Sequence, residues 1–175
     1  MENLNDLVQS GKNGFEKLLE KIPGIGGYQK KEDRRDTDKI VREAVAQRFE
    51  EQWKRISAIQ VDLLKTGGLT HVGDLESAAL KIRQFIDRVK TATYGYAGLL
   101  DAVKVDESAL EQLYDYDLYL FSLADSVKTA VDKVENAVAS GEGIEDANRS
   151  LIQISQECIV AFNRRSEVVT GTVNS

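Results

Sequence analysis

Asp117 is the residue whose position most directly suggests chemistry. It lies in the stretch LYDYDLYLF, residues 113–121, on the same expected helix face as Leu113 and Leu120. A carboxylate on an apolar helix face costs free energy unless a cation or a hydrogen-bond donor pairs with it. Two interpretations follow: a structural pair that fixes the helix register, or a polar group that lines a ligand pocket. We expect its partner among Arg48, Arg55, Arg88, Tyr94 and Tyr96.

A group of tyrosines is expected near Asp117, at one end of the hairpin formed by the third and fourth predicted helices. Aromatic side chains with polar tips favour interfaces. The segment TATYGYAG, residues 91–98, also places two glycines inside a helix, which allows either a close helix crossing or room for a pocket. We predict a binding surface here, formed by Tyr94, Tyr96, Tyr114, Tyr116 and Tyr119.

The other reactive side chains do not form a catalytic set. The single histidine, His71, lies in the expected turn GGLTHVGD, and the single cysteine, Cys158, lies on an inward helix face. A thiol in such a place usually behaves as a small hydrophobic group. Zinc and di-iron centres need several histidine, cysteine or glutamate ligands in set spacings. The sequence therefore predicts no catalytic residue, no cofactor and no metal site.

The stretch KIPGIGGYQKKEDRRDTDK, residues 21–39, has the glycines of a phosphate-binding loop but not their spacing. A P-loop requires G-x-x-x-x-G-K-[ST] after a strand, and this segment follows an expected helix. Pro23 ends that helix, because the residue before a proline is pushed out of the helical region. We predict a joint over residues 23–28, in which Tyr28 packs as an anchor.

Apolar residues recur every three or four positions along the chain, which is the period of an α-helix. This pattern predicts an N-terminal amphipathic helix over residues 1–22, a helical bundle over 29–165 and a flexible tail over 166–175. Short links between long amphipathic helices favour antiparallel neighbours. The expected fold is all-α, an antiparallel bundle of four long helices plus a shorter N-terminal amphipathic helix. The long helices are expected over about 29–65, from an N-cap at Asp74 to about 103, from Asp106 to the GEG at 141–143, and over about 145–165.

The composition suits one folded domain. The 175 residues are 42% hydrophobic and 30% charged, with a net charge of −6. Acids alternate with bases in KKEDRRDTDK, which argues against nucleic-acid binding. No apolar run approaches the roughly 20 residues that span a bilayer, and the N-terminus lacks the pattern of a secretory signal. A single cysteine suits a reducing compartment, so we expect a cytoplasmic protein.

The N-terminal helix is the second candidate interaction element. Its apolar face includes Leu4, Leu7, Phe15 and Leu18. Helices that bind anionic lipid are usually basic, whereas residues 1–22 carry four acidic and three basic side chains. We expect this helix to dock on its own bundle or on a protein partner. Peripheral binding at the inner membrane surface is the alternative.

The segments IPGIGGYQKKEDRRDTDKIVRE, residues 22–43, and ATYGYAGLLDAVKV, residues 92–105, resemble a group of bacterial proteins without an established activity. That group carries an IPGxxGY segment, a charged DRR/DK run and a YGYAGxxDAVK segment. The resemblance covers about a fifth of the chain. It implies only a loose association with membrane- or envelope-stress gene sets, and no functional residue.

The function expected from these patterns is that of a non-enzymatic interaction or scaffold protein, which binds a protein partner or a second copy of itself. Two alternatives remain open. One is a peripheral membrane-binding protein that uses its N-terminal helix. The other is a small-ligand-binding bundle with a polar site near Asp117.

Overall fold

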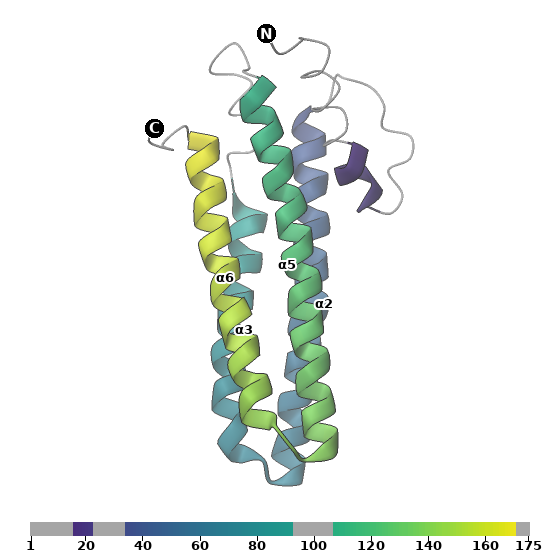
Figure 1. The fold of residues 1–175 in the computed structure, drawn as a ribbon, viewed down its shortest axis with the longest axis vertical. Helices are drawn as coiled ribbons and strands as arrows, with labels where there is room; N and C mark the ends of the chain where they lie inside the picture. The colour runs from purple at the N-terminus through teal and green to yellow at the C-terminus, as the bar shows by residue number, and fades with distance from the viewer. Residues whose placement is uncertain (1–15, 23–33, 93–106, 171–175) are drawn as a thin grey trace.

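The chain folds into an all-α bundle, as predicted. The computed structural model describes residues 16–22, 34–92 and 107–170. Within them lie four long helices, and no strand: α2 (Arg34–Thr66), α3 (Leu69–Thr91), α5 (Glu107–Ser140) and α6 (Ile144–Thr170). A short helical turn at residues 16–20 precedes them and lies beside the bundle (Figure 1).

Glycines with positive φ make the two short connections between these helices. Gly67 has φ +85°, and the next amide, that of Gly68, donates to the carbonyl of Leu63 at 2.8 Å. Gly141 has φ +76° and donates to the carbonyl of Ala137 at 2.9 Å. Left-handed glycines of this kind end helices and satisfy carbonyls of the last turn. Each connection therefore reverses the chain within two or three residues.

Two predicted helix boundaries were wrong. α3 begins at Leu69, so His71 and Asp74 lie inside the helix, and neither the HVGD turn nor the Asp74 cap exists. Gly67 and Gly68 already complete the reversal, and Gly73 inside the first turns costs only about 1 kcal/mol. α6 continues to Thr170, beyond the predicted end at 165. The predicted course of the third helix beyond Ala92 lies outside the described residues.

The four helices pack as two hairpins placed side by side. α2 contacts α3 and α5, and α6 also contacts α3 and α5, which leaves α2 diagonal to α6 and α3 diagonal to α5. Consecutive helices run in opposite directions, as predicted (Figure 1). Because α3 and α5 are diagonal, however, two of the four packed pairs, α2 with α5 and α3 with α6, run parallel.

Side-chain contacts define the register of the two parallel helix pairs. Arg48 contacts Asp125, and Arg55 contacts Asp132, so α2 faces the residue 77 positions later on α5. Across the other parallel pair, the Asn148 amide donates to the carbonyl of His71, again 77 positions away. The two hairpins therefore lie in one common register along the bundle.

The core is apolar and aromatic at its centre. The rings of Phe49 and Phe85 pack at a tilt of 45° with centroids 4.4 Å apart, and Phe162 meets Phe85 edge-on at 6.3 Å. All four long helices contribute fully buried side chains, which join them into one core. These include Phe49 and Ile56 of α2, Phe85 and Ile82 of α3, Phe121 and Val131 of α5, and Leu151 and Cys158 of α6.

Arg55 is the main polar link between α2 and α5. Its guanidinium donates to both oxygens of Glu135, at 3.0 and 2.6 Å, to Asp132 at 2.6 Å, and to the side-chain carbonyl of Gln52 at 2.9 Å. The hydrogen bond to Glu135 is the main cause that raises the pKa of Arg55. The hydrogen bond from Arg55, with a further one from Lys128, lowers the pKa of Asp132. A bidentate arginine of this kind also fixes geometry.

We predict that Arg55→Gln lowers the free energy of unfolding by about 1–2 kcal/mol, because charge-assisted hydrogen bonds to two carboxylates are lost. Urea denaturation followed by circular dichroism measures the change. The control is Arg149→Gln, which removes an ion pair to Asp146 whose side chains are largely exposed. Arg149→Gln should change the free energy of unfolding by no more than about 0.5 kcal/mol. Equal effects of the two substitutions would contradict the role given to Arg55.

The difference between the original chain and Arg55→Gln should depend on pH. The pKa of Asp132 is lowered in the folded state, so its stabilisation is present above the unfolded-state pKa and is lost as the pH falls through the lowered value. The two proteins should therefore differ most near neutral pH and converge below about pH 4. A difference that does not change with pH would show that the Asp132 carboxylate does not take part.

Candidate functional site

The structure describes five of the predicted site residues. Leu18, Tyr114 and Asp117 are buried, whereas Tyr116 is partly buried and Tyr119 is exposed. The others lie outside the described residues: Leu4, Leu7, Phe15, Tyr28, Tyr94 and Tyr96.

The described end of the N-terminal element docks on its own bundle. Leu18 has no exposed surface, and Ile22 is also part of the core. Arg48 of α2 holds this segment, because its guanidinium donates to the carbonyl of Lys21 at 3.0 Å. The same guanidinium lies 4.9 Å from the ring centroid of Phe121 and 3.5 Å from a carboxylate oxygen of Asp125. Arg48 thereby joins the segment, α2 and α5 at one point.

Asp117 belongs to the core face of α5. It is 1% exposed and is followed along the same side of the helix by Leu120 and Phe121, which are also buried. The three arginines considered as its partners donate elsewhere: Arg48 and Arg55 as described above, and Arg88 to the side-chain oxygen of Asn163 at 2.9 Å. Asp117 and Tyr114 each have an interaction partner. Their burial favours a role in packing over a role at an open surface.

The reactive side chains are spread over the bundle. Cys158 is buried, and burial raises the pKa of its thiol to about 12. Its sulfur donates to the carbonyl of Ile154, as expected for a core cysteine. His71 lies in the first turns of α3, at the end of the bundle far from the first turns of α5 (Figure 1). In the described ranges, no three side chains of His, Cys, Asp or Glu group in a way that could hold a metal ion.

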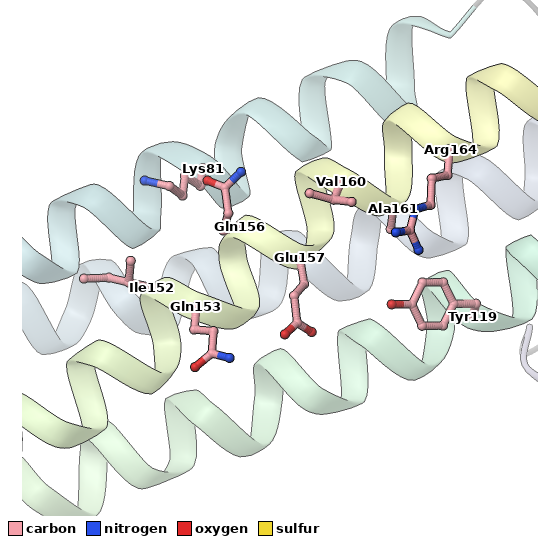
Figure 2. Close-up of a pocket in the computed structure, with 9 residues that line it drawn as sticks. All are labelled: Lys81, Tyr119, Ile152, Gln153, Gln156, Glu157, Val160, Ala161 and Arg164. Atoms are coloured by element: carbon pink, nitrogen blue, oxygen red, sulfur yellow. The ribbon is translucent and has the colours of Figure 1, made fainter.

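An open groove follows α6 on the surface. It has a volume of about 620 Å³ and is bounded by α6, by Lys81 of α3 and by Tyr119 of α5. Figure 2 shows Gln156 beside Lys81 on one side of α6, while Glu157 and Arg164 point toward the side where Tyr119 lies. The other lining residues are Ile152, Gln153, Val160 and Ala161.

Two of the residues that line this groove, Tyr119 and Val160, expose apolar surface. Tyr119 is 43% exposed and Val160 is 40% exposed, although both sit on helices whose opposite faces build the core. The ring of Tyr116 meets that of Tyr119 edge-on at a centroid distance of 6.4 Å, which holds Tyr119 in place. An aromatic residue held in this way presents apolar area at little entropic cost.

The charges in the groove are few and mixed. Arg164 forms no ion pair with any residue in the described part of the chain. Lys81 donates to Ser77 at 3.2 Å. Glu157 is exposed on the Tyr119 side. A ligand that covers this groove therefore meets an apolar centre, with a guanidinium beside it that no described carboxylate engages.

A second groove, of about 610 Å³, lies where the start of α2 meets the end of α3. Its charges are already engaged. Lys90 pairs with Glu50, and Arg42 donates to the carbonyls of Val89 and Lys90 at 3.4 and 3.5 Å, where it satisfies the last turn of α3. All the residues that line this groove are polar or charged, whereas the α6 groove is also lined by aromatic and aliphatic residues, so the α6 groove is the better candidate site.

Sequence reasoning found part of this site. It included Tyr119 among the clustered tyrosines but not Val160 or Arg164 of α6. Val160 falls between the inward positions Ile159 and Ala161, and an isolated outward valine is common on helices. That Val160 lines a groove together with Tyr119 of α5 follows only from the packing of α5 on α6.

Comparisons with protein-family models, with curated proteins and with solved structures found no match to the chain. The resemblance suggested by residues 22–43 and 92–105 therefore stays an expectation. Among the described residues, no helix is both long enough and apolar enough to cross a bilayer.

We predict that Leu18→Ala lowers the free energy of unfolding by about 2 kcal/mol, because it removes a fully buried side chain and leaves a cavity against the bundle. The control is Leu80→Ala on the exposed side of α3, which should change it by less than about 0.5 kcal/mol. Urea denaturation measures both. If the two substitutions have the same small effect, residues 16–22 do not dock on the bundle in solution.

Proposed function

We propose that this chain is a non-enzymatic interaction protein, whose rigid four-helix bundle binds a protein partner in the α6 groove. The observation that carries the proposal is that one groove is lined by two exposed apolar residues, Tyr119 and Val160, and by Arg164. Tyrosine and arginine are enriched where interfaces concentrate their binding energy. The core behind them, with Phe121 and Cys158 fully buried, supplies a stiff support.

The chemistry of the groove indicates the partner. Tyr119 and Val160 favour an apolar side chain of the partner, and the guanidinium of Arg164 favours a neighbouring carboxylate. The groove is open and runs along a helix, which suits a helix or an extended segment better than a small molecule. Pockets for small ligands bury most of the ligand surface.

The membrane alternative has less support. Leu18 and Ile22, which belong to the apolar face that would enter a bilayer, are covered by the bundle, and Arg48 donates to the carbonyl of Lys21. Lipid binding through this face would require the segment to leave its site. The small-ligand alternative near Asp117 also has less support, because that carboxylate is almost fully buried.

The proposal places the protein in the cytoplasm, because its one cysteine is a buried core residue that needs no oxidising compartment. The resemblance of residues 22–43 and 92–105 suggests a role in envelope stress. In that case the partner that binds the groove would lie at the membrane surface.

Site-specific photo-crosslinking tests the proposal. A photoreactive phenylalanine derivative at position 119 of the full chain should give one discrete adduct with another protein in extracts of the cells that make the chain. Unmodified chain should compete for this adduct. A Val160→Asp competitor should be at least about tenfold weaker, because a carboxylate then enters the apolar centre of the groove.

The matched control carries the same derivative at Ser126, an exposed position of α5 that does not line the groove. It should give no such adduct. The proposal fails if both positions yield the same products, if position 119 yields none, or if Val160→Asp competes as well as the unmodified chain.

A further inference from the structure

The outward face of α2 carries a stripe of exposed residues that no described segment covers. We call it the α2 stripe; it consists of Glu51, Lys54, Ala58, Val61, Asp62 and Lys65. Their spacing of three, four and seven residues puts them within about 100° of the helix circumference. The stripe lies on the side of α2 that faces away from α3 and α5.

The charged side chains of the stripe make few interactions within the chain. Glu51 and Lys54 form no ion pair with any described residue. Asp62 and Lys65 pair only with each other, at 3.6 Å, and their side chains are 65% and 71% exposed. Ion pairs that are this exposed contribute little to stability. At the centre of the stripe are Ala58 and Val61, the latter 49% exposed.

We propose that two copies of the chain associate through the α2 stripe, with the two α2 helices antiparallel and crossing at Ala58. The two-fold axis passes through the crossing. A residue that precedes Ala58 by a given number of positions in one copy therefore faces the residue that follows Ala58 by the same number in the other copy. Lys54 of one copy faces Asp62 of the other, four residues from the crossing on either side. Glu51 faces Lys65, seven residues away. By symmetry each pair forms twice, so all four charged positions meet an opposite charge.

The distances suit such a crossing. At 1.5 Å per residue, positions four and seven residues from Ala58 lie about 6 and 10.5 Å from the crossing. Long lysine side chains can reach a carboxylate at these places. A small residue at the crossing allows the two helices to approach closely. Val61 adds apolar surface beside Ala58, so the apolar centre has charges at both ends.

The charges also specify the register. If the helices crossed at Lys54, its two copies would face each other and repel. If they crossed at Val61, Lys54 would face Gly68 and Asp62 would face Gln60, so no opposite charges would pair. Complementary charges usually set register and partner choice more than affinity. Of these three registers, the crossing at Ala58 alone satisfies the whole stripe.

Self-association would place two partner-binding grooves on one particle. α2 is diagonal to α6 in the bundle, so a contact through α2 leaves both α6 grooves on the far sides of the dimer. This consequence rests on the proposed function, whereas the dimer itself does not. Two outward grooves on one particle would raise the avidity for a clustered partner.

Sedimentation equilibrium of the full chain tests the inference, without any partner. The original chain should show a monomer–dimer equilibrium that weakens as salt is added. Lys54→Glu should raise the dissociation constant by about tenfold or more, since it places a second carboxylate opposite Asp62 at two places in the dimer. Lys54→Glu combined with Asp62→Lys should restore dimerisation, because the pairs are then reversed.

The control is Lys133→Glu, which makes the same change in net charge at an exposed position of α5. It should leave the dissociation constant unchanged, and circular dichroism should show all variants folded. The inference is wrong if the original chain is monomeric, if Lys133→Glu acts like Lys54→Glu, or if the charge swap does not restore the dimer. A chain that dimerises but gives no adduct at position 119 would retain the inference and lose the proposed function.

Discussion

One guanidinium is the main polar contact in the parallel packing of α2 on α5. Arg55 of α2 binds Glu135 through two hydrogen bonds and Asp132 through a third, and Gln52 holds it from the preceding turn. Two parallel helices that are separated by forty residues of chain have no short connection to align them. Arg55, with Arg48 about two turns earlier, fixes the polar register of α2 on α5, while the shared apolar core packs one hairpin against the other. The groove over α6 exists because α5 and α3 are then both beside α6.

Some charged side chains on the surface link neighbouring elements, whereas others have no described ion-pair partner and are open to a binding partner. Near the start of α2, arginine and lysine side chains are engaged with carbonyls and carboxylates of neighbouring elements, and Arg48 also fixes residues 16–22. On α6, Arg164 has no described ion-pair partner and lies beside exposed apolar side chains. On the outward face of α2, Glu51 and Lys54 likewise pair with no described residue. These two faces lie on opposite sides of the bundle, so one could hold a second copy while the other holds a partner.

The sequence predicted what depends on local pattern. The apolar period predicted helices, Gly67 and Gly141 predicted the turns, and the inward place of Cys158 was correctly inferred from its helix face. The same pattern predicts an N-cap at Asp74 after an HVGD turn, whereas α3 already begins at Leu69, directly after the two glycines. It also could not tell that α3 and α5 are diagonal, since amphipathic stripes say which face is buried but not against which helix. That Val160 and Tyr119 line the same groove also follows only from this packing, because the two residues are on different helices.

The arrangement of the four helices is the central claim, and a pair of distances tests it directly. Spin labels at Asp62 of α2 and Ala139 of α5 lie 77 residues apart, on exposed positions of neighbouring parallel helices. Labels at Asp62 and Arg149 of α6 lie across the diagonal. Both pairs can be measured by double electron–electron resonance in chains with Cys158→Ser, diluted with unlabelled chain so that only intramolecular distances contribute. The structure predicts that the distance from 62 to 139 is the shorter one. A shorter distance from 62 to 149 would mean that α6, and not α5, is the neighbour of α2, and it would contradict the arrangement on which the groove depends.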